Sequence, residues 1–124
     1  MKDYDVIVAG AGIAGSLAAA AASKGGATVL MLDRNPDATV GKKTNWGWIC
    51  GDAVAKTHID FIKEELGLGL TEPYLDLKVD GVYVFSPDLE RKFQFEGAGY
   101  SLDRPKLAKK LVEYAVKNGA RMHI

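Results

Sequence analysis

The sequence predicts an α/β fold in which parallel strands are joined by a helix, and three observations support this. Residues 4–10 and 27–33 are short apolar runs rich in β-branched residues, which is typical of strands buried on both faces. Residues 13–26 between them are rich in alanine, which favours a helix, and Gly25 and Gly26 favour its end. A strand, a helix and a strand within about thirty residues form a right-handed crossover, so we expect the two strands to be parallel neighbours.

The composition of the 124 residues fits one ordinary globular domain. The 16 basic and 16 acidic side chains balance, so nothing in the charge points to a nucleic-acid partner. Cys50 is the single cysteine, which excludes an internal disulfide and fits a reducing, cytoplasmic compartment. Cys50, His58 and His123 are far apart in the sequence, so no metal site is predicted.

Residues 6–23 contain no charged residue and imitate a signal peptide or a membrane-spanning segment. The glycines of residues 10–15 would interrupt an apolar helix, and Asp3 and Asp5 do not fit the basic leader of a signal peptide. We therefore interpret the chain as a soluble, cytoplasmic one, with a peripheral membrane contact as the alternative.

The middle of the chain predicts a loop followed by a helix over residues 34–67. Residues 34–49 lack periodicity, whereas residues 52–67 carry apolar side chains at helical spacing. The predicted helical face consists of Val54, His58, Phe61, Ile62 and Leu66. We expect Asp52 to cap the start of this helix, with a cofactor contact as the alternative. We expect His58 to be a core histidine rather than a catalyst.

A β-hairpin is predicted over residues 78–97, inserted into the α/β fold. The stretches "DGVYVFS" and "RKFQFEG" alternate as antiparallel strands do, and the turn between them centres on Pro87 and Asp88.

A second amphipathic helix and a further strand are predicted over residues 103–124. Asp103 can cap the helix, Pro105 is tolerated in its first turn, and Gly119 ends it. Its inner stripe consists of Leu107, Leu111 and Ala115, and its lysines form a solvated face. Residues 120–124 begin the next strand.

A glycine motif and an acidic residue are the features of the sequence that indicate a binding site. Gly10, Gly12 and Gly15 form a Gly-x-Gly-x-x-Gly motif between the first strand and the first helix. Gly10 permits a tight turn, Gly12 lets the backbone approach a diphosphate, and Gly15 lets the helix pack close to the sheet. The small side chain of Ala14 keeps this approach open, and Asp33 ends the second strand.

These residues predict a binding site for an adenine dinucleotide. The start of the first helix would direct unpaired N–H groups and a partial positive charge at the phosphates. The carboxylate of Asp33 is placed to accept hydrogen bonds from ribose hydroxyls. An acid at this position argues against a 2′-phosphate but leaves the choice between NAD and FAD open.

Resemblance to known families narrows this choice to FAD. The stretch "DYDVIVAGAGIAGSLAAAAASKGGATVLMLDR" resembles the N-terminal segment of the glutathione-reductase-like flavoproteins. The stretches "CGDAVAKTHIDF", "GVYVFSPD" and "YSLDRPKLAKKLVEYAVKNGA" resemble the geranylgeranyl reductase family. The resemblance implies a Rossmann-like FAD-binding domain of the glutathione-reductase type with an inserted β-hairpin. Because the family's proteins are longer, we expect residues 1–124 to be the N-terminal part of this domain, with the substrate domain absent.

The resemblance also implies a set of cofactor-binding residues. Ala14, Gly15 and Asp33 would contact the ADP half of FAD, Cys50, Gly51 and Ala53 would line the flavin, and Arg104 would reach the cofactor. The full predicted set is Gly10, Gly12, Ala14, Gly15, Asp33, Arg34, Cys50, Gly51, Ala53 and Arg104. Cys50 is the one catalytic candidate, as a residue that shapes the substrate pocket or supplies a proton. Packing in the core is the alternative for Cys50. We expect Trp46 and Trp48 to pack in the core or in a lid, with lining of an isoprenoid channel as the alternative.

The activity implied by this resemblance is FAD-dependent reduction of C=C bonds in geranylgeranyl groups of isoprenoid lipids. An external donor, NAD(P)H or a ferredoxin-like protein, would supply the electrons. A flavin monooxygenase or halogenase of similar fold and a non-catalytic nucleotide-binding module are the alternatives. We expect the 124 residues alone to bind FAD poorly and to be inactive.

Overall fold

A computed structural model describes residues 3–34 and 51–124, and the chain divides into two compact units. Unit 1 consists of Met1–Ile49 and Arg104–Ile124, and unit 2 consists of Cys50–Asp103. The length of the chain predicted one domain. The structure differs because the segment inserted between the halves of unit 1 packs mainly on itself.

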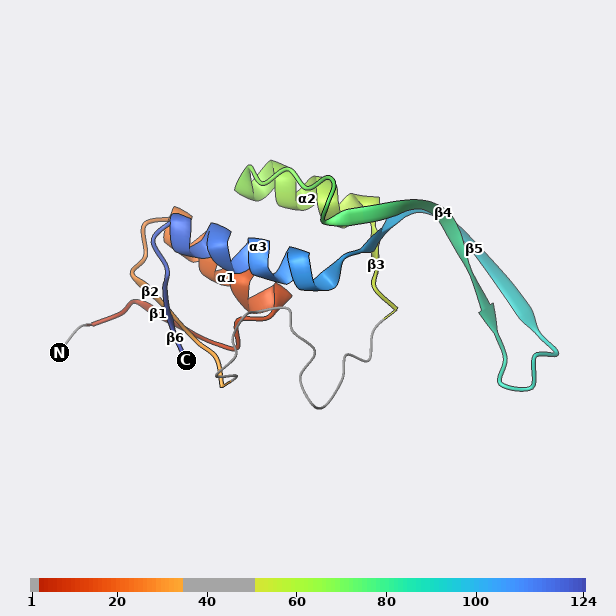
Figure 1. The fold of residues 1–124 in the computed structure, drawn as a ribbon, viewed down its shortest axis with the longest axis horizontal. Coiled ribbons are helices and arrows are strands. Elements are labelled where there is room, and N and C mark those ends of the chain that lie inside the picture. The colour runs from red at the N-terminus through yellow and green to blue at the C-terminus, as the bar shows by residue number, and fades with distance from the viewer. Residues whose placement is uncertain (1–2, 35–50) are drawn as a thin grey trace. The chain divides into compact units, whose positions relative to one another are not determined.

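Unit 1 contains a parallel sheet and two helices (Figure 1). Its strands lie in the order β1-β2-β6, and β2 pairs in parallel with both neighbours. The elements of this unit are β1 (Val6–Ala9), α1 (Ile13–Lys24), β2 (Val29–Leu32), α3 (Arg104–Lys117) and β6 (Arg121–His123). The predicted strand–helix–strand crossover, the second helix and the last strand are therefore confirmed.

The core of unit 1 lies between its sheet and helices α1 and α3. Val29 and Met31 of β2 are almost completely buried, as are Ala19 and Ala20 of α1. The alanines let α1 approach the sheet and α3 closely, because they add little volume between the elements. The predicted inner stripe of α3, formed by Leu107, Leu111 and Ala115, is buried.

Strand β1 is not buried on both faces, contrary to the prediction from its apolar sequence. Ile7 is 60% exposed, while Val6 and Val8 are half-buried. β1 lies at an edge of the described sheet, and α1 covers the face that carries Val8. The residues described in unit 1 leave the opposite face open, so alternate side chains of β1 are exposed.

Asp5 and Thr28 join the starts of β1 and β2 through hydrogen bonds. The Thr28 hydroxyl and the Thr28 N–H donate to Asp5 Oδ2 over 2.6 and 2.8 Å. These bonds hold the pKa of Asp5 below its ordinary value, with the hydroxyl contributing most. The charged carboxylate therefore stabilises the folded state more than the unfolded one.

We predict that Asp5→Asn removes part of the acid sensitivity of unfolding. Because the pKa of Asp5 is lower in the folded state, its contribution is complete at neutral pH and disappears as the pH falls from about 5 through the lowered pKa. Urea unfolding should show wild type as the more stable protein at pH 7, with the difference shrinking in acid. Thr28→Ala, which lacks the hydroxyl donor, should behave likewise. A difference between wild type and Asp5→Asn that is the same at every pH would contradict this assignment.

Unit 2 is an antiparallel sheet with one helix. Its strands lie in the order β3-β5-β4. The elements are β3 (Ala53–Ala55), α2 (Lys56–Leu66), β4 (Leu75–Phe85) and β5 (Lys92–Leu102). The predicted hairpin is confirmed, but its strands extend beyond residues 78–97 because their pairing continues as far as Leu75 and Leu102. The same end of β5 also pairs with β3.

The turn of the hairpin is held by its own polar groups. The Ser86 N–H donates to the Arg91 carbonyl over 2.9 Å, and the Asp88 carboxylate accepts hydrogen bonds from the Ser86 hydroxyl and the Glu90 N–H. These bonds lower the pKa of Asp88, the Ser86 hydroxyl contributing most. The turn therefore lies where Pro87 and Asp88 predicted it.

The helix predicted over residues 52–67 begins later, at Lys56. Val54 was assigned to the apolar face of this helix. It lies instead in β3, where it pairs with Tyr100 of β5. A Cβ on Gly99 would lie 2.5 Å from the Val54 carbonyl oxygen, so a glycine permits this close pairing. Asp52 has a left-handed φ of 50° and lies four residues before the helix starts at Lys56, where Ala55 is the cap residue, so its predicted role as the helix cap is wrong.

The buried face of α2 also differs from the prediction. Ile59 and Leu66 are buried, whereas Phe61 is 62% exposed. His58 is exposed, so its interpretation as a core histidine is wrong. The side of α2 that carries His58 and Phe61 is therefore exposed, and the helix buries the side that carries Ile59 and Leu66.

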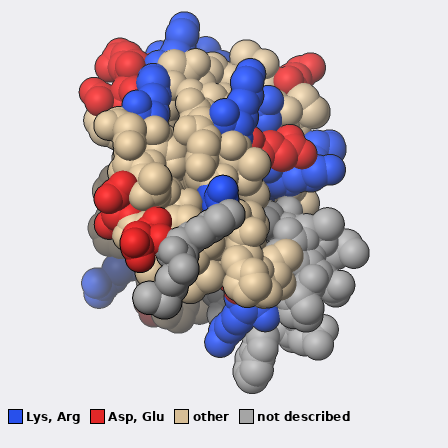
Figure 2. Space-filling view, turned by 90° about the vertical axis from the view of Figure 1, so that its left-hand side faces the viewer, with Lys and Arg blue, Asp and Glu red and all other residues tan. Residues whose placement is uncertain are grey.

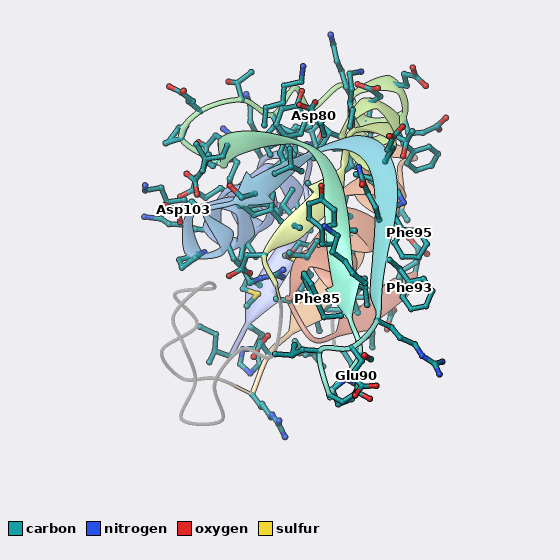
Figure 3. The ribbon with its side chains drawn as sticks, turned by 90° about the vertical axis from the view of Figure 1, so that its right-hand side faces the viewer. Asp80, Phe85, Glu90, Phe93, Phe95 and Asp103 are labelled. Atoms are coloured by element: carbon teal, nitrogen blue, oxygen red, sulfur yellow. The ribbon has the colours of Figure 1, made fainter. Side chains whose placement is uncertain are left out.

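The hairpin presents aromatic and β-branched side chains to solvent. Val82 lies opposite Phe95, and Val84 lies opposite Phe93, so these four share one face of the two-stranded ribbon. Figure 3 shows Phe93 and Phe95 pointing the same way from β5. On the other face, the Lys92 ammonium lies 4.1 Å from the centre of the Tyr83 ring. All four members of the apolar face are about half exposed, so this face offers a contact surface.

The charged surface is mixed in sign. Figure 2 shows Lys and Arg interspersed with Asp and Glu on the visible face. Lys109 and Glu113 pair across one turn of α3 at 3.9 Å, an exposed contact that contributes little stability. Within residues 3–34 and 51–124, no helix combines the length and apolar character needed to cross a bilayer.

Candidate functional site

A tight turn at Gly10 takes the chain out of β1. Its φ is +99°, a left-handed conformation that strains any L side chain. The Gly10 N–H donates to the Leu32 carbonyl of the neighbouring strand over 2.7 Å. The predicted need for glycine in this turn is confirmed by its backbone conformation.

Gly12 is the cap residue of α1 and leaves the space beside it open. No side chain caps the helix, and a Cβ added at Gly12 would meet nothing within 4 Å. The first N–H groups of a helix have no partner within the helix and carry a partial positive charge. Ala14, exposed in the first turn, adds only a methyl group. This helix end is therefore accessible to an anion.

Gly15 allows α1 to lie directly against β1. A Cβ there would overlap the Gly10 carbonyl oxygen, and it would lie 3.1 Å from the carbonyl carbon and 3.2 Å from Val8 Cγ1. Gly10 and Gly12 together form the exposed side of the turn, whereas Gly15 forms its packed side. We call residues 10–15 the glycine elbow.

The carboxylate of Asp33 faces the glycine elbow. Its Oδ2 accepts a hydrogen bond from the Ala11 N–H over 2.8 Å, and the Asp33 N–H donates to the His123 carbonyl over 3.1 Å. The side chain is half-buried at the end of β2. Asp33 therefore joins the elbow to the sheet while remaining accessible.

A hollow of about 540 Å³ opens beside the elbow. Its lining consists of Ala9, Gly10, Leu32, Asp33 and Arg34. It lies at the carboxyl ends of two parallel strands, where open α/β sheets bind their ligands, and its size is in the range of ligand pockets. The structure thus brings Gly10, Asp33 and Arg34 together, as the sequence predicted.

The geometry agrees with what comparison with known proteins shows. The sequence model of one family, glucose inhibited division protein A, matches residues 5–66. The chain belongs to the glucose inhibited division protein A family. This family binds FAD, so the predicted cofactor and the predicted Rossmann-like α/β fold are confirmed.

Relatives of this chain include proteins named digeranylgeranylglycerophospholipid reductase. The chain is 33% identical over 122 residues to the digeranylgeranylglycerophospholipid reductase of Sulfolobus acidocaldarius, covering 96% of this chain and 25% of that protein. A geranylgeranyl bacteriochlorophyll reductase-like crystal structure from Thermoplasma acidophilum matches with a TM-score of 0.74 and 30% identity, over 96% of this chain and 29% of that one. The resemblance to geranylgeranyl reductases is therefore confirmed.

The fold is shared more widely than this. The flavin-dependent brominase Bmp2 matches with a TM-score of 0.73 and 21% identity over 97% of this chain and 29% of that one, a likeness that shows the fold alone. The chain spans between a quarter and a third of each of these proteins.

Arg104 is the first residue of α3 and lies in unit 1 with the glycine elbow. Helices α1 and α3 run side by side in the same direction, so both begin toward the carboxyl ends of the strands (Figure 1). This placement agrees with a role for Arg104 at the cofactor. Its contact with FAD stays a prediction.

The other predicted flavin contacts belong to unit 2, whereas the glycine elbow belongs to unit 1, so their contact with FAD stays a prediction. Gly51 and Ala53 are exposed residues of unit 2, and Ala53 is part of β3 rather than of a helix start. The helix that was expected to open at Asp52 and Ala53 begins at Lys56 instead. Cys50, Trp46 and Trp48 lie outside the described residues.

Sequence reasoning missed Ser16, which the structure places beneath the elbow. This residue is fully buried, and its hydroxyl donates to the Ala11 carbonyl over 3.0 Å. The available signal was a polar residue directly after Gly15, within the apolar first part of the helix.

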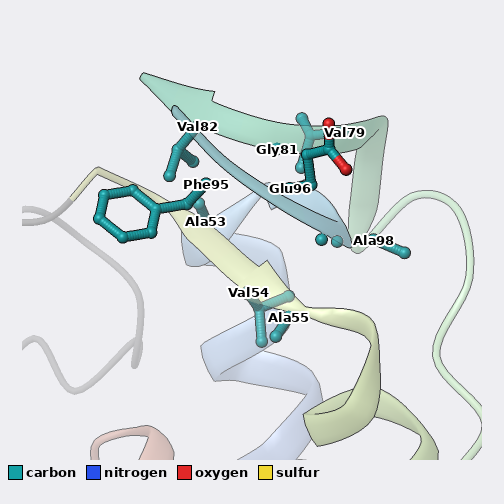
Figure 4. A pocket seen from close by; sticks show the side chains of 11 residues that line it. Ala53, Val54, Ala55, Val79, Gly81, Val82, Phe95, Glu96 and Ala98 are labelled. Carbon is teal, nitrogen blue, oxygen red and sulfur yellow. The ribbon is translucent and has the colours of Figure 1, made fainter. Parts of the chain in front are cut away.

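Unit 2 has an apolar hollow of its own, of about 230 Å³ (Figure 4). Glu96 is the one charged residue among those that line it. The others are Ala53, Val54, Ala55, Val79, Gly81, Val82, Phe95, Gly97, Ala98 and Gly99. This lining suits an apolar group. In the described part of the chain, no three His, Cys, Asp or Glu side chains gather as metal ligands would.

Proposed function

We propose that this protein is an FAD-dependent oxidoreductase that reduces C=C bonds in the geranylgeranyl groups of isoprenoid lipids. The observation that carries the proposal is the similarity to named digeranylgeranylglycerophospholipid reductases over at least 96% of this chain. The apolar hollow of unit 2 supports an apolar substrate. Electrons would come from an external donor, NAD(P)H or a ferredoxin-like protein, and the lipid substrate would bring the protein to a membrane surface.

In this proposal the glycine elbow and Asp33 hold the ADP half of FAD. The open side of Gly12 leaves room for the diphosphate at the uncapped start of α1, where N–H groups and the helix dipole favour negative charge. Asp33 accepts hydrogen bonds from the ribose, and the small Ala14 keeps the approach clear. FAD, when bound, supplies the transfer of hydride to the double bond.

The remaining predicted residues would serve the flavin half. Gly51 and Ala53 would line the ring, and Arg104 would bind a phosphate oxygen through its permanent charge. Cys50 would shape the substrate pocket or supply the proton that completes reduction. These roles rest on resemblance to the geranylgeranyl reductases.

The proposal predicts a yellow protein that hydrogenates isoprenoids. The protein expressed from its complete gene should show the visible absorption of bound flavin. After reduction of the flavin, a geranylgeranyl lipid should gain the mass of two hydrogens for each bond reduced. Cys50→Ser run in parallel should keep the flavin and slow this step. Oxygenated or halogenated products would contradict the reductase assignment and indicate a monooxygenase or halogenase. A folded, colourless protein would indicate a non-catalytic nucleotide-binding module.

A further inference from the structure

We infer that Ser16 is a positioning residue that sets the direction of a diphosphate-binding N–H group in the glycine elbow. This inference rests on the proposed binding of FAD at the elbow and adds a residue to that site. Ser16 itself is buried beneath the turn, so it acts through the backbone and does not touch the cofactor.

Ala11 is held on both sides by polar groups. Its N–H donates to Asp33 Oδ2 over 2.8 Å, and its carbonyl accepts the Ser16 hydroxyl over 3.0 Å. Ala11 is itself 1% exposed, and its bond to Ser16 is buried, whereas its bond to Asp33 is partly buried. The Ser16 N–H donates to the Gly12 carbonyl over 2.9 Å, which ties the same helix residue to the next peptide as well.

The bond to the Ala11 carbonyl fixes the N–H of Gly12. The two groups belong to one planar trans peptide and point in opposite directions. Since the carbonyl is drawn inward to the buried hydroxyl, the Gly12 N–H is directed away from Ser16. Gly12 is exposed, with open space beside its Cα.

Loss of the hydroxyl would therefore weaken cofactor binding through the direction of this peptide. Without Ser16 Oγ, the buried Ala11 carbonyl loses a donor, and rotation of the peptide toward the cofactor becomes less costly. Such a rotation would turn a carbonyl oxygen toward the diphosphate in place of an N–H. An N–H group that already points in the binding direction needs no reorientation when the cofactor binds, so the bond from Ser16 favours higher affinity.

The same helix offers a matched control in Ser23. This residue is also buried, but among the described residues its hydroxyl has no hydrogen-bond partner. Ser16→Ala and Ser23→Ala remove the same atom from opposite ends of α1. The two differ in whether that atom is bonded to the elbow.

The test compares both variants of the protein expressed from its complete gene. Apoprotein titrated with FAD should bind about 3- to 10-fold more weakly in Ser16→Ala, the loss expected for one buried hydrogen bond, and unchanged in Ser23→Ala. The ³¹P resonances of bound FAD should shift in Ser16→Ala alone. A general loss of packing would not move these resonances selectively.

The outcomes separate the two claims. Wild-type affinity or unchanged ³¹P resonances in Ser16→Ala, with FAD bound to wild type, would overturn the role of Ser16 and leave the proposed function standing. Wild type that binds no FAD would overturn both. Should Ser16→Ala fail to fold, Ser16→Cys can replace it, because cysteine keeps a weak donor at this position. Ser16→Cys should then show weaker FAD binding and shifted ³¹P resonances, both smaller than those expected for Ser16→Ala.

Discussion

Replacing Gly12 with aspartate should weaken FAD binding strongly without destabilising the protein. Gly12 is the cap residue of α1, and no side chain caps this helix. Aspartate is among the best cap residues, so Gly12→Asp should leave the free energy of unfolding unchanged or raise it by a few tenths of a kcal/mol. The space beside Gly12 is open, and its φ of −69° suits any L residue.

The same substitution places a carboxylate where the diphosphate is expected. Like charges in close contact cost several kcal/mol, and each 1.4 kcal/mol is a factor of about ten in affinity. We therefore expect the Kd for FAD to rise by about 100-fold or more. Titration of apoprotein with FAD, followed by flavin fluorescence, measures this directly.

Gly69→Asp is the matched control for this prediction. Gly69 is an exposed glycine of unit 2 with nothing within 4 Å of an added Cβ. This substitution adds the same charge in unit 2 and leaves the start of α1 unchanged, so FAD affinity should stay at the wild-type value. Equal FAD affinity in Gly12→Asp and wild type would show that the diphosphate does not lie at the start of α1.

Replacing Gly15 with alanine should instead destabilise the fold itself. An added Cβ would overlap the Gly10 carbonyl oxygen, and backbone cannot move aside as a flexible side chain can. Overpacking of a core typically costs about 1–3 kcal/mol, and a clash with backbone belongs at the upper end of this range or above it. The free energy of urea unfolding should fall by about 3 kcal/mol, and FAD affinity should fall with it.

Gly25→Ala provides the comparison at the other end of α1. Gly25 has a φ of −75°, and an added Cβ would lie 3.3 Å from the nearest atom, the Ala22 carbonyl oxygen. Its effect on unfolding should stay within about 1 kcal/mol. Equal stabilities of Gly15→Ala and Gly25→Ala would contradict the close packing of α1 on β1.

Local sequence patterns predicted the glycine elbow well because its requirements are local. The turn at Gly10, the open side of Gly12 and the packed side of Gly15 each depend on one residue type at one position. Asp33 followed from its place at the end of a strand, and the structure confirms that its carboxylate faces the elbow.

Features that depend on distant partners were not predicted. β3 forms because Val54 pairs with Tyr100 on a strand far along the chain, and helical spacing in the sequence concealed this. The exposure of Ile7 depends on what covers the sheet, which an apolar run does not reveal. Ser16 was missed because a hydroxyl in a helix gains meaning only from its acceptor, the Ala11 carbonyl.

The structure of the FAD complex tests the central claim most directly. A crystal structure of the protein expressed from its complete gene, with FAD bound, should place diphosphate oxygens at hydrogen-bond distance, about 2.7–3.2 Å, from N–H groups of the elbow between Gly12 and Ala14. It should also place a ribose hydroxyl within the same distance of the Asp33 carboxylate. FAD bound with its diphosphate away from the elbow, or with Asp33 facing no part of it, would contradict the account.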